Sequence, residues 1–323
     1  MSESLTALAP PGPIIEWSRL GHVYVVGNGK GGVGKTTTSA HIGALVASDG
    51  ARTLLIDLNG QGNIGLLLGY AHTEQDDQGK NLFSAVTTGA PLQPLRNVRP
   101  NLDVVPGGHY VRKIGPVVSA EMTTQDEARR VLLSLADAIQ KVAGQYQLII
   151  IDSPPENPLL LHIALCAARF VIVPMRSDGF SRAGLRELAS DIRGMREHNP
   201  YLMLLAVFVF ASGTGSTKIR RELGETVSQD LGHSSDLLVD SFIRHAESVA
   251  NDMVKYGLLA HELEQEIANN PRHWEIRKGT ARNATVVSVT SRLVAEDYDK
   301  LAAEILTRAA TRRGEMIQQG VWP

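Results

Sequence analysis

Short runs of apolar residues alternate along this chain with longer segments in which apolar positions recur at the period of a helix. Continuous apolar runs predict strands that helices cover on both faces, because a strand buried on one face alternates apolar and polar positions. Strands that alternate with helices are typical of βαβ units. The pattern therefore predicts the α/β class: one domain with a mostly parallel twisted sheet and helices on both faces.

The predicted elements can be assigned to residues. The strands are His22–Val26, Thr53–Asp57, Leu102–Pro106, Leu148–Asp152, Phe170–Pro174, Leu204–Phe210 and Leu237–Phe242. The helices are Lys35–Ser48, Gln125–Ala143, Leu159–Ala168, Arg182–Arg196, Lys218–Asp230 and Ser291–Gln318. No internal repeat and no apolar run of about 18 residues interrupts this alternation, so the pattern favours neither a solenoid nor a membrane span.

Two segments depart from the alternation. Residues 1–20 contain three prolines and lack the basic start and apolar centre of a secretory signal peptide, so they predict a flexible arm ahead of one domain at 21–323. Residues 261–284 begin with several Glu residues and a His, and they contain Pro271. This composition predicts an inserted, exposed excursion.

The composition narrows the class of protein. With 43% hydrophobic and 20% charged residues, the chain is neither collagenous nor disordered. Its single cysteine excludes an internal disulfide, a zinc site made of thiolates and an iron–sulfur cluster, and it fits a reducing cytoplasm. The net charge of −2 gives the whole chain no affinity for nucleic acid, so any such binding requires a local basic patch.

A glycine-rich segment follows the first predicted strand. GKGGVGKT, Gly29 to Thr36, satisfies the pattern G-x-x-x-x-G-K-[ST] and opens the first predicted helix. In such a loop successive N–H groups face a polyphosphate, Lys35 adds a positive charge and the Thr36 hydroxyl can ligate Mg²⁺. A tight turn without a ligand is the alternative. The predicted nucleotide-binding residues are Gly29, Lys30, Gly31, Gly32, Val33, Gly34, Lys35, Thr36 and Thr37.

Two later strands each end in an aspartate. Asp152 closes the run LIIID before Pro154 and Pro155, where the second carboxylate of a phosphoryl-transfer site is expected beside Mg²⁺. Asp57 ends the run LLID in the same way. The alternative role of Asp152 is to cap the next helix. The predicted metal site consists of Thr36, Asp57 and Asp152.

Four blocks, in this order, resemble the deviant Walker A ATPases of the ParA/MinD group, most closely the plasmid and chromosome partitioning ATPases. They are NGKGGVGKTTT, LLIDLNGQGN, LIIIDSPPE and FVIVPMRSDGFSRAGL, and the resemblance covers about 21–196. It implies a P-loop NTPase fold, ATP and Mg²⁺ as cofactors, and a homodimer that encloses two ATP molecules. It also implies that Lys30 reaches the phosphates bound by the second subunit, and that Lys30, Asp57 and residue 59 act in catalysis.

One block departs from the family pattern. Family members usually read D-x-D-P-Q-G-N, whereas this chain has Asn59 for the second Asp and Gly60 for the Pro. An amide can hydrogen-bond a water but cannot accept its proton, and a glycine loosens the loop. We therefore expect ATP binding with slow hydrolysis. The alternative is that Asn59 has no effect in a family that is slow already.

The same resemblance implies non-specific DNA binding by the ATP dimer, a ParB-like centromere-binding adaptor protein, and a cytoplasmic, nucleoid-associated location. DNA phosphates would be contacted by clustered basic side chains, although such charges can also be a solvated helix face. The candidates are Lys218, Arg220, Arg221, Arg308, Arg312 and Arg313.

Three other functions remain open. A membrane-positioning switch of the MinD type would need a basic amphipathic C-terminal helix, which TRRGEMIQQGVWP resembles little, so no stable membrane association is expected. A small-molecule synthetase with the same loop would turn over a metabolite without DNA. The third is an interaction protein that binds ATP as a clamp and hydrolyses little of it, and Asn59 favours this function because an amide cannot act as a general base.

Overall fold

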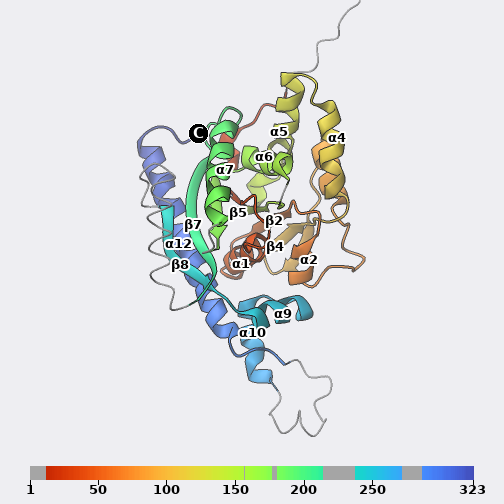
Figure 1. Cartoon of the computed structure of the whole chain (residues 1–323). Coiled ribbons are helices and arrows are strands. Elements are labelled where there is room, and N and C mark those ends of the chain that lie inside the picture. The colour runs from red at the N-terminus through yellow and green to blue at the C-terminus, as the bar shows by residue number, and fades with distance from the viewer. Residues whose placement is uncertain (1–11, 156, 177–179, 214–236, 271–285) are drawn as a thin grey trace, which may run out of the picture.

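A computed structural model describes residues 12–155, 157–176, 180–213, 237–270 and 286–323 (Figure 1). Its sheet has the strand order β3-β4-β2-β5-β1-β6-β7-β8, and every neighbouring pair is parallel except β3 and β4. The strands are β1 Val23–Val26, β2 Thr53–Asp57, β3 Leu95–Arg99, β4 Leu102–Val105, β5 Leu148–Asp152, β6 Phe170–Met175, β7 Met203–Ser212 and β8 Leu238–Arg244. The predicted α/β class with a mostly parallel sheet is confirmed.

Helices connect these strands. They are α1 Lys35–Ser48, α2 Asn63–Leu67, α3 Lys80–Thr88, α4 Ile114–Glu121, α5 Gln125–Gln140, α6 Pro158–Ala167, α7 Phe180–Met195, α9 Glu247–Tyr256, α10 Ala260–Glu266 and α12 Ser291–Gln318. Short 3-10 helices are η1 Trp17–Leu20, η2 Val111–Lys113, η3 Ala143–Gln145 and η5 Ile267–Asn269. The predicted bounds of α1, α12, β2 and β5 match the structure. The predicted helix at 218–230 lies outside the described residues.

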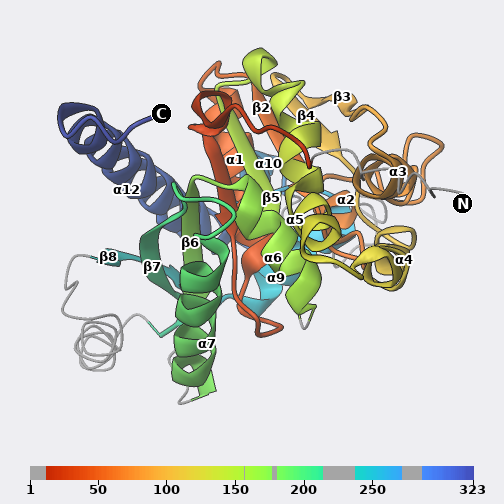
Figure 2. The ribbon, with the colours of Figure 1, turned by 90° about the horizontal axis from the view of Figure 1, so that it is seen from above.

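Helices cover both faces of the sheet. Val23 and Val25 point to a core shared with α3, α4, α5, α6 and α7, whereas Tyr24 and Val26 point to a core shared with α1, α2, α9, α10 and α12. This alternation of side chains between two apolar layers explains why the strands read as continuous apolar runs. In Figure 2, α12 lies at the left of the molecule, and α3 and α4 lie at the right.

The sequence pattern missed β3 and several short helices. β3 is an antiparallel edge strand with a half-exposed, mostly polar pattern, and Asn97 within it has a φ of 52°. Edge strands lack the continuous apolar run on which the prediction depended. The helices α2, α3, α4, α9 and α10 have 5 to 10 residues, so their amphipathic periods are too short to identify in isolation.

The two departing segments contain packed residues. The 3-10 helix at 17–20 buries Leu20, and the backbone N–H of Glu16 donates to Gln140 on α5 (2.9 Å). In the described start of the 261–284 segment, Leu263 of α10 is fully buried and lies against α12, while the residues around it are half-buried or exposed. Across the described ranges, no helix is both long enough and apolar enough to cross a membrane.

Candidate nucleotide-binding site

The glycine-rich loop joins β1 to α1 at the carboxyl ends of the central strands. Gly32 and Gly34 have φ values of 70° and 84°, which lie in the left-handed region that glycine adopts without strain. A Cβ on Gly34 would also stand 2.2 Å from the ring of Phe210. The loop therefore requires glycine at position 34 for both backbone and space. α1 begins at Lys35, so its N-terminal N–H groups face the loop.

Hydrogen bonds within the loop fix Lys35 and the backbone of Lys30. Lys35 is 5% exposed, and its Nζ donates to the carbonyl of Lys30 (2.6 Å). The N–H of Lys30 donates to Oδ1 of Asn28 (3.0 Å), while Nδ2 of Asn28 donates to the carbonyl of Pro174 at the end of β6 (2.8 Å). Asn28 therefore ties the start of the loop to the sheet.

Two buried carboxylates meet beside the loop. Asp57 and Asp152 are partners in the register of β2 and β5, and both are fully buried. Asp152 accepts from the hydroxyls of Thr36 (2.7 Å) and Ser39 (3.3 Å), whereas Asp57 accepts from the N–H groups of Asn59 and Ile64 (3.0 and 3.3 Å). The structure thus brings Thr36, Asp57 and Asp152 together, as predicted from the sequence.

The carboxylate pair has the properties of a cation site. Burial, together with the charge of Asp152, raises the pKa of Asp57 well above its ordinary value, and burial raises the pKa of Asp152 to about 7. Among the described residues no cluster of three or more His, Cys, Asp or Glu side chains converges. Mg²⁺ in nucleotide sites is commonly held by one or two carboxylates, a hydroxyl, waters and phosphate oxygens. The hydroxyl of Thr36 and the two carboxylates fit that donor set.

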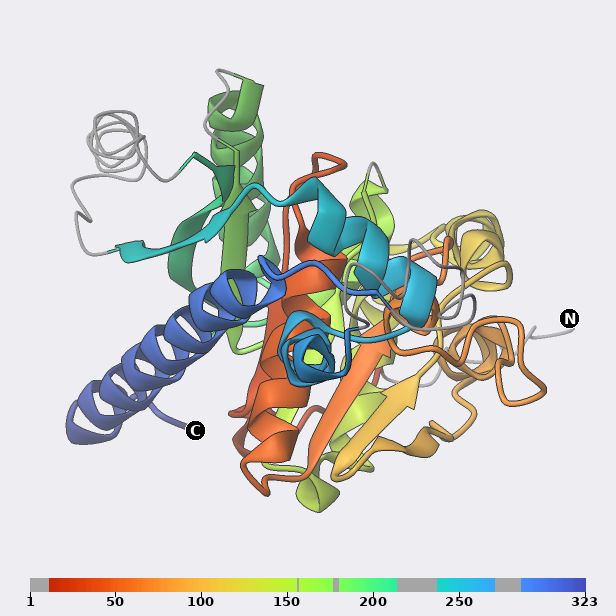
Figure 3. The same ribbon diagram turned by 90° about the horizontal axis from the view of Figure 1, so that it is seen from below.

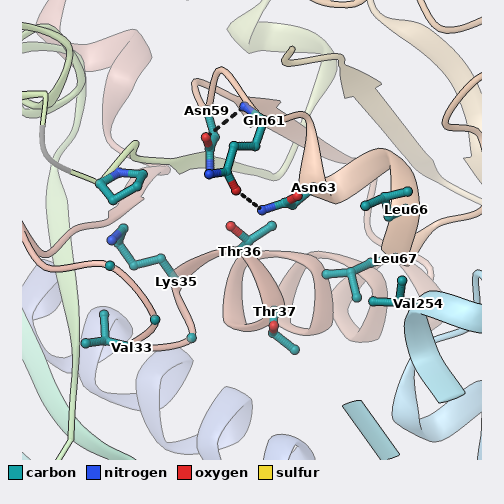
Figure 4. Close-up of a pocket in the computed structure, with 14 residues that line it drawn as sticks. Val33, Lys35, Thr36, Thr37, Asn59, Gln61, Asn63, Leu66, Leu67 and Val254 are labelled. Atoms are coloured by element: carbon teal, nitrogen blue, oxygen red, sulfur yellow. Dashed lines mark hydrogen bonds between the residues drawn. The ribbon is translucent and has the colours of Figure 1, made fainter. Parts of the chain in front are cut away.

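The segment after β2 lies over the loop. Asn59 is 5% exposed; its Oδ1 accepts from the N–H of Gln61 (3.0 Å), and its carbonyl accepts from the N–H of Gly108 (2.9 Å). The side chain of Gln61 in turn accepts from Nδ2 of Asn63 (3.0 Å). These contacts place Asn59 and Gln61 on the same side of the loop as Lys35 (Figure 4).

A pocket of about 520 Å³ lies between this segment and the loop (Figure 4). Its lining includes Gly31 to Thr37, Asn59, Gln61, Asn63, Leu66, Leu67, Pro155 and Val254. Gly29 lines a neighbouring pocket, and half-buried Lys30 belongs to the lining of neither. Val254 comes from α9 and carries no local sequence signal. Ser39 could have been identified, since one helical turn separates it from Thr36.

A second pocket of about 200 Å³ shares Thr37 with the first. Its apolar lining includes Phe210 of β7, Ile243 of β8 and Met253 of α9, and its polar lining includes Arg244. Arg244 is fixed there because it pairs with Asp297 of α12 through two hydrogen bonds of 2.7 Å. The two pockets therefore adjoin at Thr37 of α1.

His41 links the loop helix α1 to the C-terminal helices α10 and α12, which lie beside α1 in the view of Figure 3. One ring nitrogen, Nδ1, bonds to the carbonyl of Thr37 (2.7 Å), and Nε2 accepts from the N–H of Ala260 (3.0 Å). The ring stacks on Tyr298 of α12 with 3.7 Å between centroids. An accepting Nε2 requires a neutral ring, and burial lowers the pKa of His41 to about 3.

Acidification is expected to destabilise the wild type more than His41→Gln. The unfolded histidine takes up a proton below its ordinary pKa of 6.5, whereas the folded one does so only near 3, so stability present above 6.5 is lost as the pH falls. From pH 6.5 to about 5 the loss is about 2 kcal/mol, at about 1.4 kcal/mol per unit. Urea unfolding of both proteins at about pH 7.5 and 5 measures it. An equal pH dependence would assign the proton uptake to other groups.

The predicted basic clusters differ in what the structure describes. Lys218, Arg220 and Arg221 lie outside the described residues. On α12, Arg308 contacts Glu304 and the carbonyl of Leu238, Arg312 contacts Glu315, and Arg313 lies 5.4 Å from the ring of Trp322. The C-terminal cluster is thus partly engaged within the chain.

Comparisons with known proteins identify the family of this chain. A family model described as an AAA domain matches residues 21–204. The chromosome partitioning protein ParA of Myxococcus xanthus is 33% identical over 198 residues, which are 60% of this chain and 66% of that protein. ParA of Caulobacter vibrioides is 32% identical over 227 residues, 68% of this chain and 79% of that protein.

Solved structures share the fold. McdA from Cyanothece, in a complex with ATP, has a TM-score of 0.62 and 18% identity, over 75% of this chain and 89% of that one. Cobyrinic acid a,c-diamide synthase from Mycobacterium smegmatis, with an ATP analogue and magnesium, has a TM-score of 0.55 and 26% identity, over 63% and 78%.

The glycine loop, the carboxylate pair and the strand order define a P-loop nucleotide-binding protein. Within that class, the chain belongs to the ParA/MinD type of P-loop ATPases. The resemblance predicted from the four sequence blocks is thereby confirmed.

Proposed function

We propose that this chain is a DNA partition ATPase that dimerises on ATP, binds DNA without sequence preference and responds to a ParB-like adaptor protein. The observation that carries the proposal is a complete phosphate loop that has a second lysine, Lys30, five residues before Lys35 and outside the lining of its own pocket. We infer that Lys30 contacts the phosphates bound by a second subunit, because a lysine ammonium is a strong hydrogen-bond donor to phosphate oxygens. The relatives named ParA support the same function.

ATP with Mg²⁺ is the ligand that we infer for the larger pocket. The phosphates would lie against the N–H groups of the loop and Lys35, and Thr36 and Asp152 would hold the cation, with Asp57 acting through water. When bound, Mg²⁺ offsets negative charge on the phosphates during transfer. The bound ATP analogue and magnesium of the M. smegmatis synthase support this assignment.

The adenine ring would enter the smaller pocket. That pocket adjoins Thr37, the first loop-helix residue beyond the cation site, so a nucleotide whose phosphates follow the loop would direct its base there. The apolar side chains of Phe210, Ile243 and Met253 offer the surface that a flat aromatic ring requires.

Lys30→Ala is expected to preserve ATP binding and to prevent ATP-dependent dimerisation. The phosphates of the same subunit keep Lys35, whereas the cross-subunit contact is lost. Nucleotide titration and sedimentation with ATP measure the two effects separately, with Lys35→Ala as the control that loses both. A Lys30→Ala protein that still sediments as an ATP dimer would remove the cross-subunit role.

An Arg220→Ala/Arg221→Ala variant is expected to bind DNA more weakly in the presence of ATP. Each lost phosphate contact should also reduce the steepness of the salt dependence. The other candidate cluster is tested in parallel by Arg312→Ala/Arg313→Ala on α12, measured at the same salt concentration. DNA binding that is unchanged in the first variant and reduced in the second would transfer the role to the C-terminal cluster.

A small-molecule synthetase is the second candidate, and the fold shared with a diamide synthase favours it specifically. This function predicts ATP consumption that depends on a metabolite and not on DNA. Phosphate release measured with DNA and adaptor, and separately with carboxylic acid substrates plus an ammonia donor, distinguishes the two functions. Flotation with anionic lipid vesicles in the presence of ATP tests the membrane alternative in the same preparation.

A further inference from the structure

Gly60 is a glycine for reasons of space. Its φ is not among the positive values found in this chain, so the backbone at this position does not need the freedom of glycine. A Cβ on Gly60 would, however, stand 2.3 Å from Cγ of Arg112 and 3.1 Å from its Nε. The side chain of Arg112 occupies the space that any larger residue at position 60 would fill.

Arg112 also bonds to the peptide that it covers. Its Nε donates to the carbonyl of Gly60 (2.7 Å). Arg112 lies in η2 just after β4, where its neighbour Val111 is fully buried and donates its N–H to the carbonyl of Gly108 (3.0 Å). The backbone from which Arg112 reaches out is therefore anchored in the core.

The peptide that Arg112 holds carries the residues over the phosphate loop. The carbonyl of Asn59 accepts from the N–H groups of Gly108 (2.9 Å) and Gly62 (3.1 Å), and its side chain accepts from Gln61. Asn59 and Gln61 both line the larger pocket. The segment after β2 is thus connected to the segment after β4 by one backbone bond and by the side chain of Arg112.

We propose that Arg112 is a positioning residue of the nucleotide site: by holding the Gly60 carbonyl it fixes Asn59 and Gln61 over the phosphate end of the pocket. The absence of a side chain at position 60 makes room for Arg112, and the bond from Arg112 restricts the motion of the backbone at Gly60. A proline at position 60 would restrict the same backbone through its ring. This inference rests on the proposed ATPase function for its kinetic consequence, but not for its effect on the loop itself.

Five variants test it: Arg112→Ala, Arg112→Gln, Gly60→Pro, the double variant Gly60→Pro/Arg112→Ala, and Lys113→Ala as a control on the same 3-10 helix. Steady-state phosphate release with ATP gives kcat and KM. Amide hydrogen exchange of the 58–66 segment in the nucleotide-free protein gives the order of the loop independently of activity. The exchange readout follows the N–H groups of Gln61 and Gly62, which bond to Asn59.

Arg112→Ala should lower kcat by about two- to tenfold, the range that one net hydrogen bond supports, with little change in KM. Exchange of the 58–66 segment should accelerate by a similar factor. Arg112→Gln should stay near wild type, because its Nε2 can donate at the reach of the arginine Nε. Gly60→Pro alone should lower kcat and accelerate exchange more than Arg112→Ala does, since the proline ring would collide with the side chain of Arg112. The double variant should recover both kcat and the slow exchange of the 58–66 segment.

Equal exchange in wild type and Arg112→Ala, or a double variant no better than Gly60→Pro alone, would overturn the inference. So would an effect of Lys113→Ala as large as that of Arg112→Ala. A wild-type protein that turns over no ATP would instead contradict the proposed function, and the exchange data would still decide the role of Arg112.

Discussion

Lys35→Ala is expected to weaken ATP binding at least about 100-fold. Lys35 is buried in the loop, and its ammonium group is the side-chain cation that α1 presents to the pocket at its N-terminus. Charge-assisted hydrogen bonds contribute about 1.5–3 kcal/mol each, and each 1.4 kcal/mol is a factor of ten in affinity. Titration with a fluorescent ATP analogue in the presence of Mg²⁺ measures the loss.

Lys80→Ala is the matched control for this experiment. Lys80 is an exposed lysine at the first position of α3, so it has the same helical position without a phosphate loop before it. Its substitution should leave affinity unchanged. An Lys35→Ala protein with the affinity of the wild type would mean that the loop does not bind the phosphates.

Asn59→Asp is expected to raise the rate of ATP hydrolysis about tenfold or more. An aspartate at this position keeps an oxygen that can accept from the N–H of Gln61, so the loop geometry should survive the change. It adds a group that can take a proton from an attacking water, and general-base assistance is typically worth about 100-fold. The gain should be smaller than that value, because a third carboxylate close to Asp57 and Asp152 adds repulsion that bound Mg²⁺ only partly offsets.

Steady-state phosphate release by wild type, Asn59→Asp and Asn59→Ala, each with DNA and adaptor present, measures this effect. The alanine variant separates charge from side-chain contact, because it also loses the bond to Gln61. Three equal rates would show that position 59 takes no part in turnover. Asp57 would then be the first residue to examine, since it lies two residues earlier in the chain and is fully buried beside the phosphate loop.

The sequence was sufficient to predict the parts of the fold that carry strong local signals. The ends of α1 are marked by the phosphate loop before it and by Gly50 after it, and the buried strands β2 and β5 are uninterrupted apolar runs. β3 was missed because an edge strand with polar residues resembles a loop. The short helices α9 and α10 are stabilised by packing against α1, α2 and α12, which no local pattern reports.

The candidate site likewise contains residues that the sequence could predict and residues that it could not. Thr36, Asp57 and Asp152 could be predicted because each follows a recognisable strand or loop, and the parallel sheet brings these ends together. The wall formed by Val254, the second pocket around Phe210 and the contact of Arg112 with Gly60 could not. Each of these depends on residues that are distant in sequence and meet only through the packing of the domain.

The proposal that this chain binds DNA as an ATP-dependent dimer is tested most directly by measuring DNA binding in different nucleotide states. Fluorescence anisotropy of a random-sequence DNA duplex would be followed with ATP and Mg²⁺, with ADP and Mg²⁺, and without nucleotide, for the wild type, Lys30→Ala and Lys35→Ala. We expect the wild type to bind only with ATP, to show no preference among duplex sequences, and to lose affinity steeply as salt is raised. Binding that is the same without nucleotide, or no binding by a wild type that is saturated with ATP, would contradict the proposal.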